Sequence, residues 1–255
     1  MRAGSGAGGR SAEHPSSSAA RSTGRPATGD PEDRGLSRER ILREIEGSLE
    51  RLRTDRLDLY LTHEPDPETP IEETLRALDE LVRAGKVRAF GASNVDVVQL
   101  VEALETSDRH GLARYQWVQN EYNLLERGSE DGVLSVCERE GLGFTPFSPL
   151  AGGWLTGKYR SAEAYPPGSR MTLRPEPYEQ LQNERTFRAL QAFETAAAAR
   201  EVEPAALAIA WVLSNPQVTA VVVGPRRPEQ LDTILTALEL PLSPPEREEL
   251  SGLFR

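Results

Sequence analysis

Hydrophobic residues recur along most of the chain with two alternating spacings. In residues 41–52 they fall three or four positions apart, which is the spacing of one helix face. Residues 57–61 (LDLYL) and 87–92 (VRAFGA) are short apolar runs typical of buried strands. The alternation continues to the C-terminus, with strands expected to begin near residues 57, 87, 115, 143 and 219. Strands that alternate with helices predict right-handed βαβ units and a parallel sheet.

Residues 1–36 do not follow this pattern. The first thirty contain no Leu, Ile, Val, Phe, Tyr or Lys, so they cannot bury enough apolar surface to offset the entropy of ordering. We expect a disordered low-complexity tail, or a stretch that is not natural coding sequence. Its Arg- and Ser-rich composition superficially resembles an organellar transit peptide, but it has no large apolar residues for a helical face. Residues 37–255 are expected to form a single domain.

Charge and cysteine content exclude several classes of partner. The formal net charge of -10 at pH 7 argues against a nucleic acid or an acidic membrane surface, which both need a positive footprint. No apolar run approaches the roughly 18 residues that cross a bilayer. The one cysteine, Cys137, lies among apolar residues and has no partner for a disulfide or a metal cluster, so we expect a buried thiol. Such cysteine usage is typical of a cytoplasmic protein.

Polar or aromatic residues follow each of the five expected strands. In parallel α/β folds, ligands bind where strands end and the next loops begin. A single histidine or Ser-Asn pair at such a place is more often structural than functional. The whole series favours a ligand site, and its members are His63, Ser93-Asn94, Gln119-Asn120, Phe147-Ser148-Pro149 and Gly224-Pro225-Arg226.

Five segments around these positions resemble the aldo/keto reductase family. In chain order they are DRLDLYLTHEPD (55–66), GKVRAFGASN (85–94), VQNEYNLLER (118–127), FTPFSPLAGGWLTGKY (144–159) and VVVGPRRPEQL (221–231). The resemblance covers about residues 37–253. It implies an α/β fold, an eight-stranded TIM barrel of which this chain carries strands 4–8 and lacks about the first three. The sequence is therefore expected to be N-terminally truncated or mis-started.

The resemblance also implies that NADP(H) lies across the carboxyl ends of the strands. Hydrogen bonds to the nicotinamide carboxamide are expected from Ser93, Asn94 and Gln119. Phe147 would stack on the nicotinamide ring, while the pyrophosphate would pass along Ser148, Pro149, Leu150, Ala151 and Gly152. The phosphate charges would be met by Lys158 and Arg170, and the adenosine 2′-phosphate by Gly224, Arg226 and Gln230. Thr233 and Ile234 depart from the family pattern, which puts the adenine contacts in doubt.

Carbonyl reduction in this family pairs hydride transfer with a proton from a tyrosine whose pKa is lowered by a Lys–Asp pair. His63 matches the histidine that orients the carbonyl. The tyrosine, lysine and aspartate belong to the first three strands, and residues 1–36 contain neither tyrosine nor lysine. The two lysines of the chain, Lys86 and Lys158, match other family positions. We therefore expect this chain to be inactive on its own.

Three functional hypotheses follow. The first is an NADPH-dependent reductase of a small-molecule aldehyde or ketone. The second is a non-catalytic NADP-binding regulatory subunit like a potassium-channel β-subunit, and the third is an inert fragment. A barrel without three strands would leave open edges at Leu57–Leu61 and Thr219–Gly224, which invite self-association.

Overall fold

Five parallel strands form the centre of the molecule. The computed structural model describes the backbone of residues 19–22 and all of residues 35–255. The strands pair in chain order, and they are β1 (Ala19–Ser22), β2 (Leu57–Thr62), β3 (Val87–Ser93), β4 (Trp117–Gln119) and β5 (Gly143–Phe144). Among the described residues β5 does not pair with β1, so the sheet is not closed. The α/β class and parallel sheet are confirmed, and the order is that of consecutive barrel strands.

The first strand was not expected from the sequence. Ala19–Ser22 runs parallel to β2, with Ala19 opposite Leu59 and Ser22 opposite Thr62. No strand was expected before Leu57, and β2 was expected to be an open edge; both expectations are wrong. Backbone pairing does not require large side chains, so a segment without an apolar pattern can still add to an existing strand. Residues 1–18 and 23–34 of the expected tail lie outside the described residues.

The segment Thr219–Gly224, expected to be a strand, does not form a regular one. The N–H groups of Thr219 and Val222 donate to the carbonyls of Phe144 and Pro146 at 2.8 and 2.9 Å, and Val218 forms an isolated parallel bridge with Phe144. These contacts place the segment beside β5 without a continuous ladder, so no regular strand forms. The segment is largely exposed, whereas an apolar run of this kind is usually buried.

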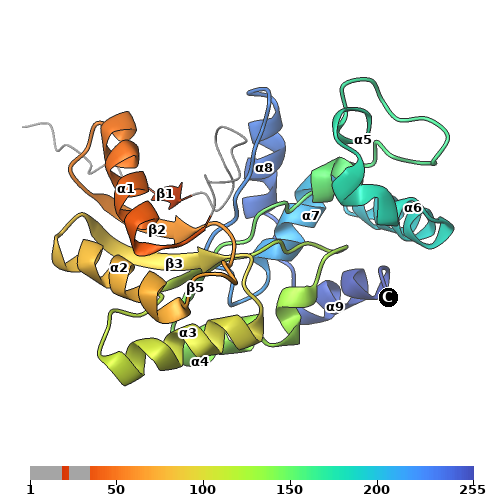
Figure 1. Cartoon of the computed structure of the whole chain (residues 1–255). Helices are drawn as coiled ribbons and strands as arrows, with labels where there is room; N and C mark the ends of the chain where they lie inside the picture. The colour runs from red at the N-terminus through yellow and green to blue at the C-terminus, as the bar shows by residue number, and fades with distance from the viewer. Residues whose placement is uncertain (1–18, 23–34) are drawn as a thin grey trace, which may run out of the picture.

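Helices follow the strands and cover the outside of the sheet. α1 to α4 pack side by side in chain order, and α7 packs on α8 (Figure 1). The helices are α1 (Arg38–Leu52), α2 (Ile71–Arg83), α3 (Val97–His110), α4 (Val133–Glu140), α5 (Arg170–Leu173), α6 (Glu184–Ala199), α7 (Pro204–Leu213), α8 (Gln230–Leu238) and α9 (Pro244–Gly252). Short 3-10 helices are η2 (Gly128–Asp131), η3 (Ala151–Thr156) and η4 (Glu176–Leu181).

Residues 176–199 form two helices with a break between them. η4 ends at Leu181, and α6 begins at Glu184 after Asn183. The side chain of Asn183 accepts a hydrogen bond from the N–H of Thr186 at 3.0 Å, which is a helix N-cap. An asparagine that caps its own helix satisfies a free N–H group, so the chain starts a new helix there.

The core lies between the sheet and its outer helices. Tyr60, Phe90, Val118 and Phe144 come from four neighbouring strands and are fully buried. Cys137 of α4 is also buried, as its apolar surroundings predicted. No helix in residues 35–255 is long and apolar enough to cross a membrane.

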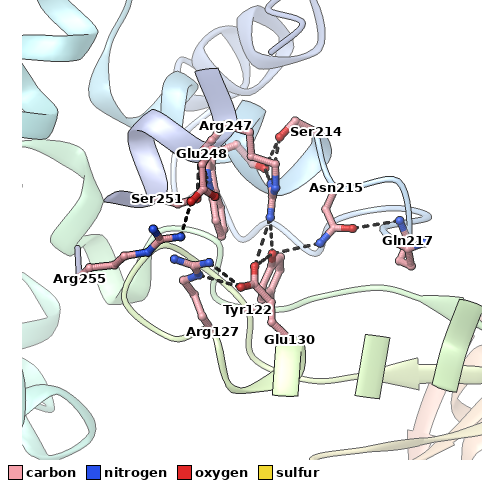
Figure 2. Close-up of polar contacts among 11 residues, drawn as sticks. Tyr122, Arg127, Glu130, Ser214, Asn215, Gln217, Arg247, Glu248, Ser251 and Arg255 are labelled. Carbon is pink, nitrogen blue, oxygen red and sulfur yellow. Dashed lines mark hydrogen bonds and ion pairs between the residues drawn. The ribbon is translucent and has the colours of Figure 1, made fainter. Parts of the chain in front are cut away.

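A polar network attaches the C-terminal helix to the loop after β4 (Figure 2). The Arg247 guanidinium of α9 donates to the Tyr122 hydroxyl, to Ser214 Oγ at 3.0 Å and to Glu130 Oε1 at 3.4 Å. It also lies 4.1 Å from the ring centroid of Trp211. The Tyr122 hydroxyl donates in turn to Glu130 Oε1 at 2.5 Å. Three segments far apart in the sequence are therefore joined at one buried point.

Candidate functional site

Four of the expected site residues meet at the carboxyl ends of β2, β3 and β4. Ser93 is fully buried, and its hydroxyl donates to the backbone carbonyl of Gln119 at 2.5 Å. Asn94 has a positive φ of 58°, and its side-chain amide donates to the carbonyl of His63 at 2.7 Å. Its Nδ2 also lies 3.4 Å from Ser93 Oγ. The structure therefore brings His63, Ser93, Asn94 and Gln119 together.

Gln119 offers a buried acceptor at this place. The residue is only 6% exposed, and its side-chain oxygen Oε1 has no hydrogen-bond partner among the described residues. A buried amide oxygen without a donor costs free energy, on the order of 1–3 kcal/mol. Such an atom fits the donor of a ligand, and a primary carboxamide is one group that supplies it.

The segment after β5 carries the next six site residues, from Phe147 to Gly152. The backbone of Phe147 forms a parallel bridge with Glu121, just beyond the end of β4. The Phe147 side chain is half-buried. Ser148 and Ala151 have positive φ values of 55° and 46°, unusual for residues with a Cβ. The side chain of Asn123 donates to the Ser148 carbonyl at 3.0 Å and supports that turn. The backbone of this loop is thus held in a defined, tight path.

Two neighbouring glycines in η3 each lie under a large side chain. A Cβ at Gly152 would come within 2.5 Å of the Tyr178 ring, and one at Gly153 would overlap the Lys158 ammonium group. Lys158 itself is exposed, with Nζ 4.9 Å from the centroid of the Tyr159 ring. Lys158 therefore reaches back over the loop expected to carry the pyrophosphate.

The expected adenine end forms a second group. The Gln230 side-chain oxygen accepts from the backbone N–H groups of Arg226 at 2.7 Å and Arg227 at 3.2 Å. The Arg226 guanidinium donates to the carbonyl of Gly168 at 3.0 Å, two residues before Arg170. Gly224, two residues before Arg226, and Arg170 are both exposed. No hydrogen bond or ion pair between described residues joins Lys158 to this group.

Thr233, a departure from the family pattern, has a hydrogen-bond partner within the protein. Its hydroxyl donates to Glu203 Oε2 at 2.8 Å. Ile234 packs its partly buried side chain against the small apolar cluster between α7 and α8. Neither Thr233 nor Ile234 therefore offers an unused polar group for contact with adenine.

Glu121 and Tyr178 are close to the site but were not expected there. Burial raises the Glu121 pKa, as does the Glu126 carboxylate, against the lowering effect of hydrogen bonds from Asn123 and Ser148. Burial also raises the Tyr178 pKa, with Glu121 adding to the effect. Alternation along the strand was the available signal for Glu121, because residues two apart from Gln119 share its face. No local pattern pointed to Tyr178.

An acidic cleft of about 400 Å³ has Asn94 in its lining. Its lining includes four carboxylates, from Asp96, Glu121, Glu126 and Asp131. Negative charge at this density opposes the phosphates of a dinucleotide. The cationic residues of the candidate site, Lys158, Arg170 and Arg226, by contrast, all lie between β5 and α8.

Comparisons with known proteins agree with this architecture. The model of the Aldo/keto reductase family matches residues 28–253. The uncharacterized oxidoreductase YrpG of Bacillus subtilis is 37% identical over 229 residues, which are 90% of this chain and 68% of that protein. A probable voltage-gated potassium channel subunit beta of Oryza sativa is 38% identical, covering 85% of this chain and 67% of the relative. Protein tas of Escherichia coli is 34% identical, with 88% and 69% covered.

Proposed function

Because this chain belongs to the aldo/keto reductase family, we propose that it binds NADP(H) at the carboxyl ends of its strands. The finding that carries the proposal is the unpartnered Gln119 oxygen beside Ser93 and Asn94. These groups complement a nicotinamide carboxamide, which has two donors and one acceptor. The bound cofactor would supply a hydride for a carbonyl carbon, and small aldehydes or ketones are the proposed substrates.

The remaining residues fit the rest of the cofactor. Phe147 is half-buried at the end of β5, where its ring would stack on the nicotinamide. The tight backbone from Ser148 to Gly152 offers N–H groups to a pyrophosphate. Lys158 and Arg170 would supply charge, and Arg226, held by Gln230, would meet the 2′-phosphate that distinguishes NADP from NAD. In a protein with a net charge of -10, these local cations would be essential for binding a dinucleotide.

His63 is the one proposed catalytic residue, and its place beside Asn94 suits the orientation of a carbonyl oxygen. A proton donor is harder to find. Lys86 pairs with Glu46, and Lys158 lies over the face of the Tyr159 ring, whose hydroxyl accepts from the N–H of Met171 at 3.4 Å. Residues 1–34 contain no tyrosine or lysine. We therefore propose that these 255 residues alone do not reduce carbonyls.

Cofactor binding can be tested with one amide on β4 and a matched control. Gln119→Leu removes the buried oxygen, and Gln116→Leu removes an exposed amide three residues earlier. NADPH binding is followed by quenching of tryptophan fluorescence. We expect Gln119→Leu to weaken binding about tenfold, which corresponds to roughly one lost hydrogen bond, and Gln116→Leu to leave it unchanged. Equal affinity in both variants would refute the proposed nicotinamide site.

Turnover is tested separately with NADPH and an aromatic aldehyde. We expect NADPH to bind without being oxidised. Oxidation at about one per second or faster, a rate ordinary for enzymes, would contradict the absence of a proton donor.

A non-catalytic NADP-binding subunit is the second candidate. It is favoured by the missing Tyr–Lys pair and by similarity to the probable potassium channel β-subunits of Oryza sativa and Arabidopsis thaliana, each 38% identical. Tight NADPH binding with no turnover would support this function. Failure to bind NADPH would leave only the inert fragment.

A further inference from the structure

Glu121 lies where the candidate cofactor site meets the acidic cleft. It follows Gln119 by two positions, and its backbone forms a bridge with Phe147. Its carboxylate accepts hydrogen bonds from Asn123, at 3.4 Å, and from Ser148, the first residue of the proposed pyrophosphate segment. Glu121 also lines the acidic cleft. A charge on this side chain therefore acts at the place where the phosphates of the proposed cofactor would bind.

No cation compensates the Glu121 carboxylate among the described residues. It forms no ion pair with them, and no lysine or arginine is among the groups that shift its pKa. Burial raises the Glu121 pKa, and the Glu126 carboxylate of the same loop adds to the effect. The Tyr178 hydroxyl interacts with Glu121 from η4, and Arg170 and Arg174 act on that hydroxyl. Glu121 is thus a partly buried carboxylate with a like charge beside it and no opposite charge paired to it.

A dinucleotide would add negative charge to this cluster. Each phosphate of a pyrophosphate is anionic, and the proposed path along residues 148–152 begins at the serine that donates to Glu121. Asp96 and Asp131 line the same cleft and make its surroundings negative. A nearby negative charge favours the neutral form of a carboxyl group. Protonation of Glu121 would therefore remove a negative charge beside Ser148 and reduce the repulsion of a bound phosphate.

We propose that Glu121 takes up one proton when NADP(H) binds, so that cofactor binding is coupled to pH. This rests on the proposed function, because it needs a dinucleotide along residues 148–152. The bound phosphates raise the Glu121 pKa above its value in the free protein. Between these two pKa values, binding should tighten by up to about tenfold for each unit by which the pH falls. Outside that window Glu121 has the same charge in both states and leaves the slope unchanged.

Titration calorimetry counts the proton directly. NADP⁺ is titrated into the protein between about pH 5.5 and 8.5 in buffers of different ionisation enthalpy, and the difference in heat gives the protons exchanged. Wild type should take up most of one proton within the window. Glu121→Gln keeps a hydrogen-bond acceptor but cannot titrate, so this uptake should disappear. Asp131→Asn is the matched control, because it removes an exposed carboxylate from the same cleft, and it should behave like wild type. The 2′-phosphate of NADP⁺ titrates near pH 6 in all three proteins, so its contribution cancels in the comparison.

Affinity at high pH tests the repulsion. Above both pKa values the wild-type carboxylate stays charged beside the phosphates, so Glu121→Gln should bind NADP⁺ at least about tenfold more tightly there. The two affinities should converge as the pH is lowered, because Glu121 is then neutral as well. Circular dichroism should match between the two proteins. Equal proton uptake in wild type and Glu121→Gln, or equal affinity at high pH, would overturn the proposal.

Glu126→Gln tests which group titrates. This variant removes the like charge that raises the Glu121 pKa, so the pH range in which binding tightens should move downward. A purely structural role of Glu121 would leave that range in place, and an unchanged or upward-shifted range would contradict the proposal. NADP⁺ binding without proton uptake would reject the proton coupling and leave the proposed function standing. Absence of NADP⁺ binding in every variant would reject both.

Discussion

Replacing Arg247 by methionine removes the charged centre of the network in Figure 2 and keeps most of its aliphatic stem. The Arg247 side chain is only 17% exposed, and its guanidinium donates to Tyr122, Ser214 and Glu130. Hydrogen bonds to charged groups contribute roughly 1.5–3 kcal/mol each, and a cation over a tryptophan ring about 0.5–2 kcal/mol. Breaking a buried ion pair costs about 3–5 kcal/mol.

The lower end of that range applies here. Glu130 keeps a second cation, since the Arg127 guanidinium lies 2.6 Å from Glu130 Oε2. The carboxylate is therefore not left unpaired when Arg247 is removed. We expect the free energy of unfolding to fall by about 3 kcal/mol.

Equilibrium urea unfolding, followed by circular dichroism, measures this change. The midpoint should fall while the slope m stays constant, because the surface exposed on unfolding is almost the same. Arg255→Met is the matched control. Arg255 pairs with Glu248, but both side chains are about 60% exposed, so the loss should be below about 0.5 kcal/mol. A loss below about 1 kcal/mol for Arg247→Met, or equal losses in both variants, would refute this reasoning.

Three further outcomes are expected. Burial opposes ionisation of Glu130, but hydrogen bonds from an arginine and a tyrosine hold its pKa below the ordinary 4.5. Its stabilising effect is thus present above pH 4.5 and lost on acidification through the lowered pKa, and Glu130→Gln should flatten urea midpoints measured between pH 6 and 3. Burial raises the pKa of Cys137 to about 12, so a thiol reagent at pH 8 should react only after unfolding, and rapid native reaction would contradict this. Gly91→Ala should destabilise by about 3 kcal/mol or more, because its Cβ would overlap the Trp117 carbonyl on the next strand, whereas Gly252→Ala, with open space around it, should unfold like wild type in the same assay.

Local patterns in the sequence predicted the elements whose causes are local. The βα alternation gave β2 to β5, and α4 ends at Gly141, whose positive φ of 67° suits a glycine. The polar residues at the strand ends were also correctly expected to gather, because parallel strands finish at one edge. Ser93, Gln119 and Asn94 do lie together there.

Features that depend on distant contacts were decided by tertiary structure alone. Tyr178 lies on Gly152, and Arg247 meets Tyr122 across 125 positions of sequence. The pairing of Ala19–Ser22 with β2 uses backbone groups, which every residue carries, so composition did not reveal it. The valines after Thr219 read as a buried strand from their composition. Their exposure depends on which neighbours surround them, and no local pattern of residues contains that information.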